Sequence, residues 1–264
     1  MLRGVCRGIK GEVGTDLSRE NFFEPIIGKK RKAAMCRFRR KYDVLQRKLG
    51  SYKNKTCLKV LDVGCHTGDM FFFLKDIASE LHGLDVNANA LKVARNRYDA
   101  KTTLCNLRAP LPYKENYFDV VIASEIIEHI PDTDAFLDNL YRVMKPGGYL
   151  MLTTPNINTI HNRLRIPFGL YPLHMSHRQP YPDNPKDIGH IRFFNATVLR
   201  SQLHEHGFID VGIYGLNLIP IMWMARFHMF YKLNSIMADM CASFSPGLIA
   251  VAQKNEASPK NQLT

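Results

Sequence analysis

The sequence lacks the cysteine pattern of a disulfide framework. Its 264 residues include six cysteines, and no two of them form a C-x-x-C pair. These six are Cys6, Cys36, Cys57, Cys65, Cys105 and Cys241. Because Cys57, Cys65 and Cys105 lie in or beside apolar runs, we expect reduced thiols that pack as small hydrophobes. The pattern argues against a disulfide-stabilised secreted domain and indicates a reducing, cytoplasmic setting.

Long apolar runs are also missing. No stretch of about 18 uncharged apolar residues exists, so we expect no membrane-spanning helix. Residues Met1 to Lys10 contain no apolar segment of the kind that a secretory signal needs. These absences predict a cytoplasmic protein whose contact with a membrane, if there is one, is peripheral.

Acidic residues are too few to balance the basic ones. The chain has 36 Lys and Arg against 24 Asp and Glu, a formal net charge of +12. This charge suits an anionic partner such as a phosphate-bearing substrate, a nucleic acid or an anionic membrane surface. It is equally compatible with a protein that is merely basic. The hydrophobic content of 45% is that of a folded chain, and the length fits one large domain with additions.

What the sequence does contain is a strand–loop–helix pattern at residues 60–69, Val-Leu-Asp-Val-Gly-Cys-His-Thr-Gly-Asp. The apolar run Leu58–Val63 leads into a loop with Gly64 and Gly68, and apolar residues then recur every three or four positions over residues 70–77. Open α/β sheets hold nucleotide-like ligands at a loop of this kind, between a buried strand and a helix N-terminus.

The loop matches neither of two common nucleotide motifs. It lacks the G-x-G-x-x-G of a dinucleotide-binding fold and the Gly-Lys-Ser/Thr of a P-loop. It does fit D-x-G-x-x-x-G, and Asp85 follows about 20 residues later at the end of the next apolar strand. A carboxylate at that position can accept hydrogen bonds from a ribose diol.

Strands and helices alternate through the rest of the chain. After the first strand, the expected strands are residues 81–86, 102–107, 118–124, 149–153, 210–214 and 248–252. The expected helices are residues 88–98, 133–143 and 196–206, with a turn at residues 145–148. Alternation at this spacing predicts an α/β fold with a doubly wound parallel sheet and right-handed crossovers.

Three segments fall outside this alternation. Residues 29–49 predict a helix with an apolar seam against the core and a solvated basic face. The basic residues of that face are Lys30, Arg31, Lys32, Arg37, Arg39, Arg40, Lys41, Arg47 and Lys48. Residues 155–194 form a long, aromatic-rich connection of the kind that serves as a lid. Residues 220–242 predict an apolar helix, and its narrow polar stripe consists of His228, Lys232, Ser235 and Asp239.

These segments define the expected domain organisation. Residues 1–57 form an N-terminal arm and the basic helix, and residues 58–254 form the main domain. Within the main domain lie the lid-like connection (157–194) and an apolar helical insertion (218–243), and residues 255–264 are a disordered tail.

The ordered motifs resemble one known family, the class I S-adenosylmethionine-dependent methyltransferases. The motifs are VLDVGCHTGD, GLDVN, LPYKENYFDVVIASEIIEHI and MKPGG, over residues 59–156. The resemblance implies a Rossmann-like seven-stranded sheet of order 3-2-1-4-5-7-6 with strand 7 antiparallel, and S-adenosyl-L-methionine as cofactor. The cofactor-binding residues that it implies are Asp62, Gly64, Cys65, Gly68, Asp85, Val86, Asn106, Leu107 and Ser124. The sequence departs from the family at His66 and Asn106, where glycine and aspartate are more frequent.

A second group of residues follows the fourth strand. If a helical turn begins there, Glu125, Glu128 and His129 share one face, and His190 could complete a cation site. This E-x-x-E-H pattern resembles the ubiquinone-pathway O-methyltransferases and the small-RNA 2′-O-methyltransferases, in which a metal assists a hydroxyl acceptor. The resulting metal ligands, for a divalent cation such as Mg²⁺, are Glu125, Glu128, His129 and His190. The catalytic candidates are His129, His190 and Glu125, with His129 as a base or orienting group. The alternative is that Glu128 and His129 are structural supports.

Three functions remain open on the sequence alone. The first is O-methylation of a small-molecule, glycan or lipid-linked hydroxyl acceptor, with a peripheral membrane contact. The second is RNA methylation of the 2′-O type, which the basic helix favours but for which no RNA-binding module is present. The third is a non-catalytic, S-adenosylmethionine-binding regulatory protein. The sequence does not predict an oligomeric state.

Overall fold

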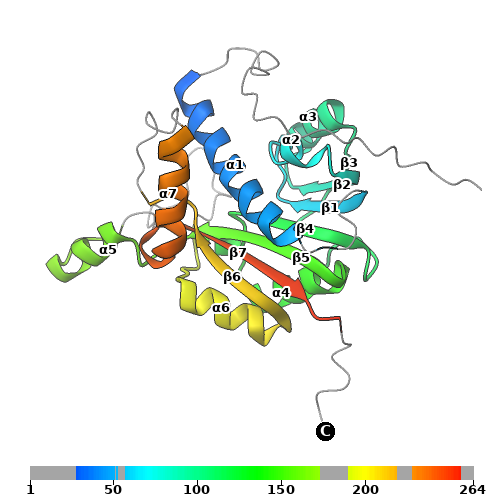
Figure 1. The fold of residues 1–264 in the computed structure, drawn as a ribbon. Coiled ribbons are helices and arrows are strands. Elements are labelled where there is room, and N and C mark those ends of the chain that lie inside the picture. The colour runs from blue at the N-terminus through cyan, green and yellow to red at the C-terminus, as the bar shows by residue number, and fades with distance from the viewer. Residues whose placement is uncertain (1–27, 51, 53–56, 173–189, 219–227, 257–264) are drawn as a thin grey trace, which may run out of the picture.

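The computed structural model describes residues 28–50, 52, 57–172, 190–218 and 228–256, which build one seven-stranded sheet. The strands are β1 Leu58–Val63, β2 Ala78–Asp85, β3 Lys101–Leu104, β4 Phe118–Ser124, β5 Met144–Pro155, β6 Phe208–Gly215 and β7 Gly247–Lys254. Their order is β3-β2-β1-β4-β5-β7-β6, and only β7 runs antiparallel to its neighbours (Figure 1). The predicted Rossmann-like fold class, strand order and antiparallel β7 are confirmed.

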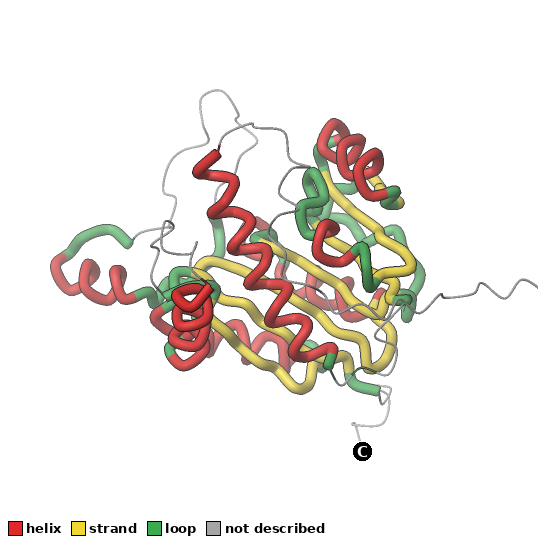
Figure 2. The backbone as a smooth tube through the Cα atoms, turned by 45° about the horizontal axis from the view of Figure 1, so that its top comes forward, coloured by secondary structure: helices red, strands yellow, loops and turns green. Residues whose placement is uncertain are grey.

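Helices cover both faces of this sheet (Figure 2). They are α1 Gly28–Leu49, α2 Phe71–Leu74, α3 Ala88–Tyr98, α4 Thr133–Val143, α5 Ile160–Arg165, α6 Ala196–Glu205 and α7 His228–Met240. Alternate strand residues point to opposite faces. Leu61 and Val63 pack in the core shared with α4 and α6, whereas Leu58 and Val60 pack in the core shared with α1, α2 and α3. The apolar strands are therefore buried on both sides, as a doubly wound sheet requires.

Several element boundaries differ from the predicted ones. The predicted turn at residues 145–148 lies inside β5, where the register against β4 shifts between Phe118 and Val120. Strand β3 ends at Leu104, three residues early, because the next residues turn away: the Arg108 N–H donates to the side-chain oxygen of Asn106 at 3.1 Å. The helix after the glycine loop is reduced to α2.

Helix α1 packs on the core through its apolar seam, but its basic face is not uniformly solvated. Val44, Leu45 and Leu49 are buried, as expected, yet Arg40 and Lys41 are buried with them. The Arg40 guanidinium donates to the backbone carbonyls of Gly215 and Ser235 and forms an ion pair with Asp239. The prediction of a solvated basic face is wrong at these two positions, and Arg40 joins α1 to β6 and α7.

Removing this buried cation is expected to destabilise the fold. Arg40→Met should lower the free energy of unfolding by about 3 kcal/mol, because buried carbonyl and carboxylate groups lose their donor. The matched control is Arg39→Met, since Arg39 forms a more exposed ion pair with Asp43 at 2.9 Å; it should cost about 0.5 kcal/mol. Urea unfolding measures both, and equal losses would contradict the assigned role of Arg40.

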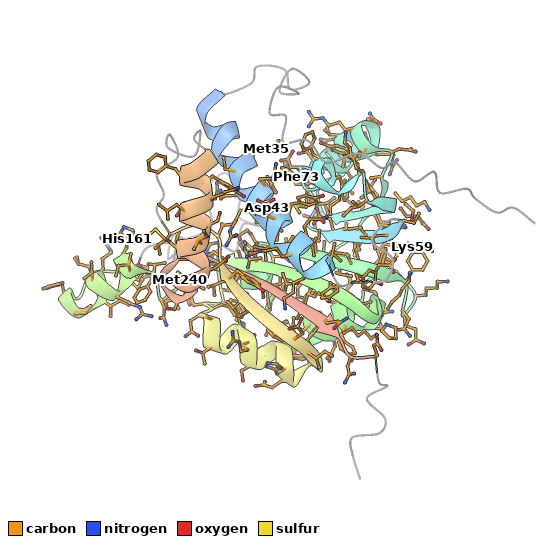
Figure 3. All side chains as sticks on the ribbon, in the orientation of Figure 1. Met35, Asp43, Lys59, Phe73, His161 and Met240 are labelled. Carbon is orange, nitrogen blue, oxygen red and sulfur yellow. The ribbon has the colours of Figure 1, made fainter. Side chains whose placement is uncertain are left out.

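Helix α7 directs the side chains of Tyr231 and Asp239 toward α1. Asp239 forms ion pairs with both Arg40 and Arg47. The Tyr231 hydroxyl donates to Asp43 of α1 at 2.6 Å, and Asp43 is labelled in Figure 3.

Part of the predicted apolar insertion, residues 219–227, lies outside the described residues, as do residues 173–189 of the lid-like connection and residues 257–264 of the tail. Among the helices of the described chain, none has both the length and the apolar character that crossing a membrane demands.

One cysteine differs from the prediction of reduced thiols. Cys57 is disulfide-bonded and exposed rather than packed in the core. Its position explains the difference, because it precedes β1 with a left-handed φ of 74° instead of entering the strand. Cys65 is a free, buried thiol, as expected, and Cys105 is free and half-buried.

Candidate functional site

The glycine loop turns sharply at the carboxyl end of β1. Gly64 and Gly68 both have φ of +77°, a left-handed conformation that favours glycine. A Cβ at Gly64 would overlap the side chain of Ile126, and one at Gly68 would lie 2.7 Å from a ring carbon of Phe71. His66 also adopts positive φ, at 46°, at the position where the resembling family prefers glycine. The loop therefore needs glycine at both predicted positions and tolerates a strained residue at the third.

Asp85 is held in place by this loop. It ends β2, and its two carboxylate oxygens accept the backbone N–H groups of His66 at 2.9 Å and Asn87 at 2.8 Å. Each oxygen keeps a lone pair for a ligand. Val86, the next residue, is largely exposed, and so is Leu104 at the end of the neighbouring strand. An oriented carboxylate beside uncovered apolar side chains suits a ribose with a flat, apolar base.

The other predicted cofactor residues lie near the same edge of the sheet. Asp62 and Cys65 are buried at the end of β1 and in the loop, and Ser124 ends β4, which pairs with β1. Asn106 and Leu107 follow β3, and the Asn106 side chain is exposed. The buried Ser124 Oγ has no hydrogen-bond partner among the described residues. The structure thus brings the predicted residues to the ends of β1, β2, β3 and β4.

Lys41 is a site residue that the sequence interpretation missed. It reaches in from α1, and its ammonium interacts electrostatically with Glu125, Asp62 and Glu128. Burial lowers the pKa of Lys41, while these carboxylates act in the opposite direction. The sequence did contain a signal: Lys41 lies three residues after Phe38 and four before Leu45, so it shares the apolar seam of the helix.

Asp62 provides a test of this buried charge arrangement. Burial raises the pKa of its carboxyl to about 7, although Lys41 opposes the shift. The folded protein therefore holds a proton that the unfolded chain, with a pKa of about 4, releases, so stability falls as pH rises from about 4 to about 7.

We expect Asp62→Asn to remove this pH dependence. At pH 8 the variant should be more stable than the original chain by about 2 kcal/mol, and the difference should shrink toward pH 5. Urea unfolding across this pH range measures the effect. Asp76→Asn is the matched control, because it removes an exposed carboxyl two residues after α2. Parallel pH profiles for the original chain and Asp62→Asn would contradict the argument.

The second group lies just after β4. A short 3₁₀ helix spans Ile127–His129, and potential ligand atoms of Glu128, His129 and His190 all lie within 4.8 Å of one another. The rings of His129 and His190 meet edge to face, with centroids 4.9 Å apart. Glu128 is buried; one of its oxygens accepts the Thr154 hydroxyl at 3.1 Å, and the other, Oε1, has no hydrogen-bond partner among the described residues. Three of the four predicted metal ligands therefore form one cluster.

Glu125 lies outside that cluster. Its φ of 55° is left-handed, so no helical turn begins there, and the shared face predicted for Glu125, Glu128 and His129 is wrong. Its carboxylate instead accepts the Thr153 hydroxyl at 2.8 Å. It remains close enough to affect Glu128: burial, and secondarily the charge of Glu125, raise the pKa of Glu128 to about 8.

His190 is positioned by backbone hydrogen bonds of its neighbours. The N–H groups of Ile191 and Arg192 donate to the Glu128 carbonyl at 2.9 and 3.2 Å. Ile157, just past β5, donates to the Phe194 carbonyl at 2.9 Å. The described end of the lid-like connection is thus attached both to the 3₁₀ helix and to the end of β5. These hydrogen bonds bring His129 and His190 into one cluster, although about 60 residues separate them in the sequence.

Comparisons with known proteins agree with this geometry. The profile of the methyltransferase domain family matches residues 28–211. A protein of Mycobacterium tuberculosis named "probable S-adenosylmethionine-dependent methyltransferase" is 31% identical over 61% of this chain and 52% of its own length. The mitochondrial ubiquinone biosynthesis O-methyltransferase of Rattus norvegicus is 33% identical over 42% of this chain and 35% of its own length. The chain thus spans only about half, or less, of these two relatives.

Solved structures share the fold. An S-adenosylmethionine-dependent methyltransferase of Thermotoga maritima superposes with a TM-score of 0.55 at 16% identity, over 86% of this chain and 94% of its own. Phosphoethanolamine N-methyltransferase 2 of Haemonchus contortus, solved with S-adenosyl-L-methionine, gives 0.52 at 18% identity, over 81% of this chain and 52% of its own. The family profile covers well over half of the sequence, and the chain belongs to the methyltransferase domain family, as its resemblance to the class I S-adenosylmethionine-dependent methyltransferases predicted.

Proposed function

We propose that the chain is an S-adenosylmethionine-dependent O-methyltransferase whose acceptor is a hydroxyl group on a small-molecule, glycan or lipid-linked compound. The observation that carries this proposal is the cluster of Glu128, His129 and His190 beside the cofactor loop. Lys41 links the two regions, because its buried ammonium interacts with Asp62 of β1 and also with Glu128. The similarity to ubiquinone biosynthesis O-methyltransferases supports a hydroxyl acceptor.

The residues at the strand ends fit S-adenosylmethionine. Asp85 would bind the ribose hydroxyls, Val86 and Leu107 would line the adenine, and the open backbone at Gly64 and Gly68 would approach the methionine part. When bound, the cofactor supplies an electrophilic methyl group on a sulfonium. The work left to the protein is to align the acceptor with that methyl group and to exclude water.

The clustered residues fit a hydroxyl acceptor. His129 would hold or remove the hydroxyl proton while the methyl group is transferred, and Thr153 and Thr154 would fix the carboxylates on either side. The unpartnered Glu128 Oε1 and the two imidazoles also fit a divalent cation, which would acidify a hydroxyl bound to it. We propose Glu128, His129 and His190 as its ligands. Two nitrogens and one carboxylate suit zinc better than Mg²⁺.

RNA is a less suitable acceptor for this chain. The basic helix was the feature that favoured RNA, and burial of Arg40 and Lys41 removes two of its cations from any surface that RNA could reach. The Glu128, His129 and His190 cluster likewise argues against a purely regulatory role, because a protein that only binds the cofactor needs no such group.

A methyl-transfer assay tests the proposal. The full chain is incubated with S-adenosylmethionine labelled in the methyl group and with separate pools of quinone precursors, glycolipids and RNA. We expect label in an organic-extractable or glycan product, and we expect a chelator to abolish this transfer and added Zn²⁺ to restore it. Label in RNA alone would overturn the acceptor class. Cofactor binding without transfer to any pool would support the regulatory alternative.

A further inference from the structure

A projection extends from the body of the molecule immediately after β5. It consists of α5 and a 3₁₀ turn over Ile166–Phe168, and it lies beside α7 in both views (Figures 1 and 2). Its base is well anchored: the Thr159 hydroxyl accepts the Asn162 N–H at 3.1 Å, and the buried Asn162 side chain donates to the Ile157 carbonyl at 2.8 Å. Beyond this base, its side chains are almost all exposed.

Most of the exposed side chains of the projection are apolar. Leu164 is 62% exposed, Phe168 is 80% exposed, and Ile166 and Leu170 are each about half exposed. A hydrogen bond from the Leu170 N–H to the Arg165 carbonyl, at 3.1 Å, fixes the backbone turn at the end of the projection. These side chains are therefore presented outward on a defined scaffold instead of packing into the core. Several exposed apolar side chains gathered on one short segment indicate an interaction site.

Helix α7 adds to the same surface. Tyr231 and Asp239 face inward, toward α1, and the exposed side chains of residues 230–240 are apolar apart from Lys232. The outward stripe of the helix is Leu233, Ile236 and Met240, the last 80% exposed. Figure 3 shows Met240 and His161 of α5 on the same side of the molecule. This is the reverse of the usual surface helix, whose apolar stripe faces the core.

The charge around this surface is basic. Residues 156–172 contain Arg163 and Arg165 and no acidic residue. The only acidic residue of α7, Asp239, is neutralised by Arg40 and Arg47. Helix α1, which runs alongside α7 in Figure 1, adds the exposed Arg37 and the partly exposed Arg39. Exposed apolar side chains within a basic surround complement an anionic lipid bilayer, in which apolar groups enter the acyl region and cations meet the headgroups.

We propose that α5, its 3₁₀ turn and the outward stripe of α7 form a docking face for an anionic membrane surface. The face adjoins the candidate site, because Asn156 and Ile157 connect β5 to α5 and also join the chain at Phe194, four residues after His190. The docking face rests on the proposed function in one respect. It assigns the acceptor to the lipid-linked class, and such an acceptor would reach the site from the bilayer.

Vesicle flotation tests the docking face without requiring catalysis. The full chain is mixed with vesicles of phosphatidylglycerol and phosphatidylcholine in equal parts, and with vesicles of phosphatidylcholine alone. We expect binding to the mixed vesicles, weaker binding to the neutral ones, and release as salt is raised to about 0.5 M. Leu164→Ser with Phe168→Ser should reduce partitioning about 100-fold, and Leu233→Ser with Met240→Ser should reduce it about tenfold.

Val198→Ser is the matched control, because Val198 is an exposed apolar residue on α6, outside the docking face; it should bind vesicles like the original chain. The proposal is overturned if the chain does not float with anionic vesicles, or if both double variants float as it does. It is also overturned if the original chain is a dimer that the double variants convert to monomers, since the face would then join two copies. Vesicle binding without methyl transfer would refute the proposed function alone, and methyl transfer to a soluble acceptor without vesicle binding would refute the docking face alone.

Discussion

Replacing Asp85 by alanine is expected to weaken S-adenosylmethionine binding by at least about 100-fold, because the two charge-assisted hydrogen bonds that we propose it makes to the ribose are lost. The substitution also removes the acceptor of the His66 and Asn87 N–H groups. His66 holds a strained backbone conformation in the loop, so the loop loses support at the position where it needs it most. Isothermal titration with S-adenosylmethionine measures the affinity directly.

Asp85→Asn separates these two contributions. The amide keeps one acceptor oxygen and most of the shape of the side chain but lacks the charge, so its loss of affinity should fall between that of alanine and none. Thermal unfolding of both variants shows whether the fold is intact. A heat of titration that is the same for Asp85→Ala as for the original chain would remove the basis for the cofactor site.

The backbone geometry of the proposed cofactor half of the site could be predicted because its requirements are local. Two glycines at a fixed separation after an apolar strand mean positive φ and close backbone approach, and both show φ of +77°. An acidic residue at a strand end is likewise visible in the sequence, and Asp85 lies there. These features depend on backbone conformation within a few residues, which a sequence pattern reports directly.

The acceptor half depends on contacts between distant segments, which the pattern does not report. Glu125 was expected with Glu128 and His129, but a single left-handed residue at the end of β4 turns its side chain to Thr153. Lys41 was expected in solvent, because lysine is rarely buried without partners; its partners come from β1 and from the segment after β4. The sequence also did not show which face of α7 points inward. The ion pair between Arg40 and Asp239 decides this, because it holds the Asp239 side of α7 against α1.

Replacing His129 by alanine is expected to lower kcat by about 100-fold or more, with little change in S-adenosylmethionine affinity. The reason is that His129 lies in the cluster with Glu128 and His190, which we propose receives the acceptor, and not in the loop that we propose holds the cofactor. His204→Ala is the matched control: this histidine, on α6, is exposed, and its ring hydrogen-bonds the Phe208 carbonyl at 3.2 Å. Its kcat should equal that of the original chain.

The double variant His129→Ala with His190→Ala tests whether the cluster acts as a unit. If both imidazoles and Glu128 hold one cation or one acceptor oxygen, removing either histidine disables the group, so each single variant should lose about as much activity as the pair. Independent roles would instead multiply the two losses. A His190→Ala variant with full activity would show that the 4.9 Å approach of the two rings is structural, and would leave His129 to act alone on the hydroxyl proton.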